Sequence, residues 1–112
     1  MTRRNLGLLA ESVLGYSEGV RIRWYIDPDT DEPHVLKHPV TLDEVEEAVA
    51  GVVEDRVGKD GSRVLIGRTE GGRFLRVIYV PDDDPDGIFV ITAYPVGQKP
   101  LWALRRRLRR KR

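Results

Sequence analysis

A chain of 112 residues that is 40% hydrophobic and 33% charged has enough apolar material for one small core, so we expect a single domain. The chain has no cysteine, which excludes disulfides and thiolate metal sites, and no apolar run of the roughly 18–20 residues that span a bilayer, so we expect a cytoplasmic protein. The formal net charge of +1 hides an uneven distribution, because the last eight residues hold seven of the 19 basic residues and leave residues 1–104 with 12 basic and 18 acidic residues.

Residues 1–19 differ from the rest of the chain. Leucine and valine recur at roughly helical spacing from Leu6 to Leu14, and Ser17-Glu18-Gly19 then breaks the pattern. A short amphipathic helix, a flexible leader and translation from an early start codon would each fit this segment. We therefore treat residues 1–19 as an N-terminal extension to a domain of residues 20–112.

Val20–Ile26 alternates and is rich in residues that favour β-strands, so it is expected to form the first strand of the domain. The acidic, turn-rich segment 27–33 follows it. His34 and His38 are four residues apart, which is the spacing of two zinc ligands on a helix. Flanking prolines disfavour a helix there and no motif supplies a third ligand, so we expect neither a metal site nor a cofactor.

The clearest helix start in the sequence is at Thr41. Thr41 and Glu44 have the spacing of a capping box, and valines at the flanking positions can form a hydrophobic staple. Apolar residues then recur on one stripe. Gly51 favours an end of the helix at that point, whereas Val52 and Val53 would extend it.

Three further strands are expected at Arg63–Thr69, Arg73–Val80 and Gly87–Tyr94. Gly71-Gly72 between the first two is a strong signal for a hairpin with a two-residue turn. Such a turn would pair Gly67 with Arg76. Because side chains alternate along a strand, Arg68 and Arg76 would then lie on opposite faces of the sheet.

Pro100–Arg112 is typical of a terminal helix, with Leu101, Leu104 and Leu108 on one stripe. Such a stripe would dock the helix and present its arginines from a fixed surface. Arginine outnumbers lysine six to one in the last eight residues, and a guanidinium group pairs with two phosphate oxygens at once. We therefore expect RNA binding here, although a solvated tail that only aids solubility is the alternative. The arginines concerned are Arg105, Arg106, Arg107, Arg109 and Arg110.

The predicted order is strand, helix, three-strand meander and helix, which indicates an α+β domain with helices packed on a small antiparallel sheet of about four strands. Four short motifs within residues 21–112 then carry a resemblance to a known family. They are Trp24-Tyr25-Ile26-Asp27-Pro28, Lys37-His38-Pro39-Val40-Thr41, Ile66-Gly67-Arg68-Thr69 and Ile91-Thr92-Ala93. In this order they resemble the BrnT family of bacterial toxins, the ribonuclease partners of type II toxin–antitoxin pairs. The resemblance implies a RelE/ParE-like fold, RNA as the substrate and an antitoxin as the partner protein.

Ribonucleases of this fold cleave RNA without a metal, by attack of a 2′-hydroxyl on the adjacent phosphate. The protein must orient that hydroxyl, stabilise charge on the phosphate and move two protons. The resemblance points to Arg68 for the charge and to His38 as a proton donor. Arg76 interrupts an apolar strand and is a second arginine candidate, and Tyr94 stands where the family carries an arginine. Each of these side chains also has an ordinary structural role as its alternative.

We therefore predict a metal-independent endoribonuclease that acts on mRNA and is neutralised by an antitoxin. The first alternative is a non-catalytic RNA-binding or protein-interaction module, a degenerate relative of such toxins, because Tyr94 replaces an arginine. The second is an interaction protein whose acidic surface binds a basic partner. Trp102 could stack on RNA, but burial against the sheet is expected, and His34 is expected to have only a structural role.

Overall fold

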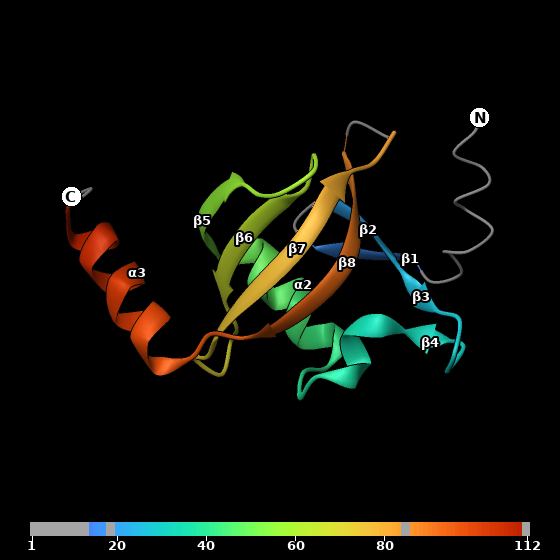
Figure 1. The fold of residues 1–112 in the computed structure, drawn as a ribbon, viewed down its shortest axis with the longest axis horizontal. Coiled ribbons are helices and arrows are strands. Elements are labelled where there is room, and N and C mark those ends of the chain that lie inside the picture. Colours follow the sequence, from blue (N-terminus) through green and yellow to red (C-terminus); the bar gives the residue numbers. More distant parts are fainter. Residues whose placement is uncertain (1–13, 18–19, 84–85, 111–112) are drawn as a thin grey trace.

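The structure of the protein, a computed structural model, describes residues 14–17, 20–83 and 86–110. A six-stranded sheet forms its centre, with one helix against a face of the sheet and another beyond the sheet's edge (Figure 1). In spatial order the strands are β1 (Leu14–Ser17), β2 (Val20–Trp24), β8 (Gly87–Pro95), β7 (Phe74–Pro81), β6 (Arg63–Arg68) and β5 (Val52–Val57). The other elements are the helices α2 (Leu42–Ala50) and α3 (Gln98–Arg110), the paired short strands β3 (Ile26–Asp27) and β4 (Glu32–Pro33), and the 3-10 turn η1 (His34–Lys37). The α+β class predicted from the sequence is confirmed.

The sheet is mixed, so the prediction of a purely antiparallel sheet of about four strands was wrong. β2 runs parallel to β8, with Arg21 opposite Gly87 and Trp24 opposite Val90. This pair joins segments near the two ends of the described chain and leaves no local signal in the sequence. In the six-stranded sheet, the two strands that the sequence did not indicate, β1 and β5, are both edge strands, and β5 carries a charged stretch in place of apolar alternation.

Most of the N-terminal extension, residues 1–13 and 18–19, lies outside the described residues. Within the extension, Leu14–Ser17 pairs with β2 as an edge strand. Neither described helix has the length and hydrophobicity that a membrane crossing requires.

α2 begins where the sequence predicts. The Thr41 hydroxyl accepts a hydrogen bond from the Glu44 backbone N–H, and the Glu44 carboxylate accepts one from the Thr41 N–H, each at 3.1 Å. The helix ends at Gly51, whose N–H donates to the Glu47 carbonyl at 2.8 Å. Val52 therefore starts β5 and does not extend the helix.

The β6–β7 hairpin has a different register from the predicted one. Arg68 lies opposite Phe74, and the Thr69 N–H donates to the Arg73 carbonyl, so the loop holds three residues and not two. Gly72 takes the left-handed backbone conformation, with φ of 93°, that such a three-residue loop requires. A shift of one residue moves side chains to the other face, so Arg68 and Arg76 lie on the same face of the sheet.

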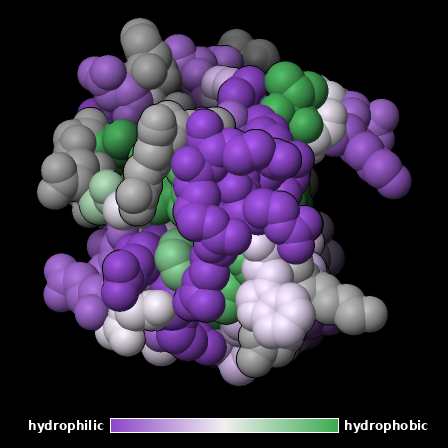
Figure 2. Space-filling view, turned by 90° about the vertical axis from the view of Figure 1, so that its left-hand side faces the viewer, coloured by the Kyte–Doolittle hydropathy of each residue, from purple (hydrophilic) through white to green (hydrophobic). Residues whose placement is uncertain are grey.

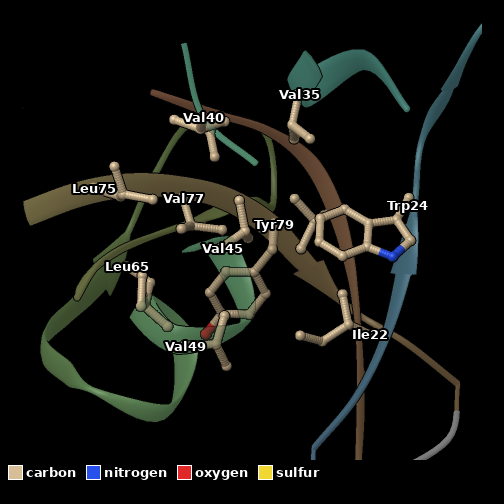
Figure 3. Close-up of a cluster of buried hydrophobic side chains, with 13 residues drawn as sticks. Ile22, Trp24, Val35, Val40, Val45, Val49, Leu65, Leu75, Val77 and Tyr79 are labelled. Carbon is tan, nitrogen blue, oxygen red and sulfur yellow. The ribbon is translucent and has the colours of Figure 1, made fainter. Parts of the chain in front are cut away.

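The core lies between the sheet and α2 (Figure 3). Trp24 and Ile22 of β2 reach it from one side, and Val45 of α2 and Val77 of β7 reach it from the others; all four are fully buried. Gly67 of β6 lets α2 come close, because a Cβ there would lie 1.7 Å from the Ala48 carbonyl oxygen. We call the opposite side of the sheet, which α2 does not cover, the open face. α3 reaches this face at its β5 end, where Arg107 binds Glu54, the residue opposite Ile66.

α3 lies beside the β5 edge of the sheet (Figure 1). Leu104 is fully buried and Leu101 and Leu108 are half-buried, as the predicted apolar stripe requires. On the same side of the helix, Arg107 donates two hydrogen bonds to Glu54 of β5, at 2.6 and 2.7 Å. Trp102, in contrast, is 63% exposed, so the expectation of its burial against the sheet was wrong.

Candidate functional site

Three of the predicted catalytic residues lie on the open face of the sheet. Arg76 of β7 is directly opposite Tyr94 of β8, and side chains of directly opposite residues point to the same face. Arg76 is also opposite Ile66, two residues before Arg68 on β6. The register therefore brings together on adjacent strands two arginines and a tyrosine that the predicted turn would have separated.

Arg76 is the most unusual of these residues. Its Nε atom is buried and has no hydrogen-bond partner among the described residues. The hydroxyl of Thr92, which is two residues before Tyr94 on the open face, is likewise buried without a partner. Buried polar groups are nearly always hydrogen-bonded, so the Arg76 Nε and the Thr92 hydroxyl on the open face are candidates for contact with a ligand.

Arg68 is exposed, and its guanidinium carbon lies 5.9 Å from the centre of the Phe74 ring. Neither Arg68 nor Arg76 forms an ion pair with any described residue. Other arginines in or next to the strands are held by carboxylates: Arg23 by Asp82, Arg63 by Asp55, and Arg73, just before β7, by Glu44. The two arginines of the candidate site therefore keep their charge for an anion that the described residues do not supply.

His38 joins this group through Tyr94. The centres of their rings are 5.6 Å apart. The contact arises because β2 ends opposite Val90, which leaves the last part of β8 without a strand neighbour on that side. η1 lies there against β8 and places His38, the residue after η1, beside Tyr94. His38, Tyr94 and Arg76 thus lie next to one another in this part of the fold. Arg68 lies on the same face of the sheet but at the end of β6, where it lines a hollow together with Glu47 of α2 and Glu70 of the hairpin loop.

His34 lies next to His38, with ring centres 6.2 Å apart, and is held by Asp27. Its Nδ1 atom is 2.9 Å from a carboxylate oxygen of Asp27, whose side chain is only 6% exposed. Hydrogen bonds from Lys37, from His34 and from the Asp29 backbone keep the pKa of Asp27 well below its usual range. The hydrogen bond to Asp27 in turn raises the pKa of Lys37.

An ionised carboxylate at Nδ1 orients the imidazole and favours the tautomer with a proton on Nδ1, which leaves Nε2 as an acceptor. The sequence did not indicate this pair. Asp27 and His34 are seven residues apart, and the β3–β4 turn brings them together.

The basic residues of α3 fall into two groups. Arg107 is bound to Glu54, and this hydrogen bond raises the pKa of the guanidinium group. Arg107 therefore anchors α3 to β5, and its contact with RNA stays a prediction. The remaining predicted RNA-binding residues are exposed: Arg105, Arg106, Arg109 and Arg110.

Among the described residues no cluster of three or more histidine, aspartate or glutamate side chains could hold a metal ion. Comparison of the chain with protein-family models, with curated proteins and with solved structures finds no match in any of the three. The resemblance to the BrnT toxins therefore stays a prediction that rests on the four motifs.

Proposed function

We propose that the open face binds a phosphodiester group of RNA and that the protein is a metal-independent endoribonuclease, with a RelE/ParE-like fold, that acts on mRNA and is neutralised by an antitoxin. The observation that carries the proposal is Arg76, which is directly opposite Tyr94 and whose buried Nε has no hydrogen-bond partner in the described part of the chain. An arginine in that state gains a strong, charge-assisted contact when a phosphate arrives.

The chemistry needs two proton transfers. In the proposed reaction the Nε2 atom of His34, oriented by Asp27, accepts the proton of the 2′-hydroxyl, and the 2′-oxygen attacks phosphorus. The bond from phosphorus to the 5′-oxygen breaks, and His38 donates a proton to that oxygen. The products are a 2′,3′-cyclic phosphate and a 5′-hydroxyl.

The other residues of the cluster stabilise the transition state in this proposal. Arg76 and Arg68 pair with the phosphate oxygens on which negative charge grows. Tyr94, in ring contact with His38 and opposite Arg76, donates a further hydrogen bond or stacks on a base. Removal of one preorganised donor of this kind slows catalysis by about 10²–10³-fold.

The test is cleavage of a labelled RNA in the presence of EDTA. The wild type should produce cyclic phosphate ends, and an oligonucleotide that lacks 2′-hydroxyls should stay intact. Arg76→Ala should lower the rate by about 10²–10³-fold. Arg56→Ala, which changes an exposed arginine on the β5 edge, is the matched control and should leave the rate unchanged. No cleavage by the wild type, together with normal growth of bacteria that express it, would reject the enzyme proposal.

The alternative is a non-catalytic module that binds RNA or a protein. It is favoured by Tyr94, which stands where the resembled family carries an arginine, and by the exposed arginines of α3. Tight binding of RNA without cleavage, with Arg76→Ala weakening the binding, would support this alternative over the enzyme.

A further inference from the structure

The outward side of α3 combines an exposed indole ring with arginines. Trp102, Arg105, Arg106 and Arg109 line one open hollow on this side. Their spacing places them on one face of the helix. In Figure 2, hydrophilic side chains cover much of the molecular face on which α3 lies.

Packing holds this side of α3 outward. Leu104 is fully buried on the opposite side of the helix, and Arg107 is bound there to Glu54. The arginines around Trp102 form no ion pair with any described residue. The helix therefore presents one flat aromatic ring and several uncompensated cations from a fixed surface.

We propose that the outward face of α3 binds single-stranded RNA, with a base stacked on Trp102 and the neighbouring phosphates paired with Arg105, Arg106 and Arg109. The proposal rests on the proposed function only for the choice of RNA over other nucleic acids. An acidic protein would satisfy the arginines but has no need of an exposed indole, whereas a nucleotide strand offers both a flat ring and a phosphate. A duplex has its bases stacked on each other, so only a single strand can use the ring.

The position of this surface suits it to hold a substrate for the open face. α3 begins three residues after the end of β8, the strand that carries Tyr94. The Val96 N–H in the connection donates to the carbonyl of Phe74, which is opposite Arg68. At a rise of about 1.5 Å per residue, Trp102 is only about 6 Å along the helix from its first residue. A strand held at Trp102 is therefore close to the Arg68 end of the open face.

Tryptophan fluorescence gives a direct test. The chain has two tryptophans, and the other one, Trp24, is fully buried in the core. A 12-nucleotide uridine strand with 2′-O-methyl groups cannot be cleaved by 2′-hydroxyl attack, so its binding is measured without reaction. Titration of the wild-type protein should quench the emission of the exposed ring, and anisotropy of the labelled strand gives the affinity independently.

Trp102→Ala should weaken binding by about 5- to 150-fold, since stacking on one aromatic side chain contributes about that factor. Trp102→Phe keeps a ring and should restore most of the affinity. Arg105→Ala should reduce the slope of log affinity against log salt by about 0.7. Arg56→Ala is the control, because Arg56 is an exposed arginine of β5 that does not line the hollow, and it should leave the affinity unchanged.

Equal binding by the wild type and Trp102→Ala would overturn the proposal, as would a duplex of the same length that binds as tightly as the single strand. Polyglutamate that competes at lower concentration than the uridine strand would point to an acidic protein partner instead. The two proposals fail separately. If the uridine strand quenches the fluorescence but unmodified RNA is not cleaved, the binding surface on α3 is supported and the enzyme proposal is rejected. If RNA is cleaved, Arg76→Ala abolishes the cleavage and the affinity does not depend on Trp102, the enzyme proposal is supported and the binding surface is rejected.

Discussion

Removal of the Arg107 side chain should destabilise the protein although Arg107 lies in the arginine-rich end of α3. The Arg107 guanidinium makes two hydrogen bonds to the Glu54 carboxylate, at 2.6 and 2.7 Å, and the Glu54 side chain is only 4% exposed. Loss of one partner leaves a buried charge uncompensated, which costs about 3–5 kcal/mol for a fully buried pair. Two features lower this cost. The Arg107 side chain is 29% exposed, and Arg56 lies 3.5 Å from Glu54. We therefore expect Arg107→Ala to reduce the free energy of unfolding by about 2 kcal/mol.

The assay is equilibrium unfolding in urea followed by far-ultraviolet circular dichroism. Arg109→Ala is the control, because Arg109 is exposed on the same helix and its loss should change stability by no more than about 0.5 kcal/mol. The double variant Glu54→Gln with Arg107→Met removes both charges and should recover part of the lost stability. Equal unfolding midpoints for Arg107→Ala and Arg109→Ala would refute the assignment of Arg107 as the anchor of α3.

Two further predictions concern the core side of the sheet. Gly67→Ala should lower the free energy of unfolding by more than about 3 kcal/mol, because the new Cβ would lie 1.7 Å from the Ala48 carbonyl oxygen. Gly71→Ala is the control, because a Cβ at this position in the hairpin loop meets no backbone atom, and it should be nearly neutral. Equal melting temperatures for the two variants would contradict this prediction. Burial and a 2.6 Å hydrogen bond to Asp55 raise the pKa of the Tyr79 phenol from 10.0 to about 12. The stability that the protonated phenol contributes is therefore fully present below pH 10 and is lost as the pH rises from 10 to 12. Tyr79→Phe should therefore flatten the fall in unfolding free energy over this pH range, and an unchanged slope would rule out the phenol as its source.

The features that the sequence predicted correctly depend on residues close together in the chain. The capping box joins Thr41 and Glu44, three residues apart, and the apolar stripe of α3 repeats every three or four residues around Leu104. The hairpin register failed because Gly71-Gly72 fits both a two-residue and a three-residue loop. In the structure the Thr69 hydroxyl also accepts a hydrogen bond from the backbone N–H of Arg73, which helps to fix the longer loop.

The members of the candidate site were predicted, but not their grouping. Arg68 matched a family motif, Arg76 interrupted an apolar strand, and Tyr94 stood where the resembled family carries an arginine. Each of these signals is local in the sequence. Whether the three side chains share a face depends on the registers of β6 with β7 and of β7 with β8. A shift of one residue in either register would place some of these side chains on opposite faces of the sheet. The orientation of His34 by Asp27 required the β3–β4 turn, for which the sequence offered only an acidic, proline-containing loop.

The acidic composition of residues 1–104 is compatible with the proposed binding of RNA at the open face, because six of the acidic side chains either lie on α2 or are held by an arginine. The helix that covers the core side carries four of them, Asp43, Glu44, Glu46 and Glu47. On the open side Asp82 is held by Arg23 and Glu54 by Arg107, so the charges of these two carboxylates are compensated by neighbouring arginines. A polyanion that approaches the open face or the outward side of α3 therefore meets guanidinium groups that form no ion pair with any described residue, whereas the acidic side chains of α2 repel it. This asymmetry predicts the direction of approach, and it also allows a basic partner protein to bind the α2 side without blocking RNA.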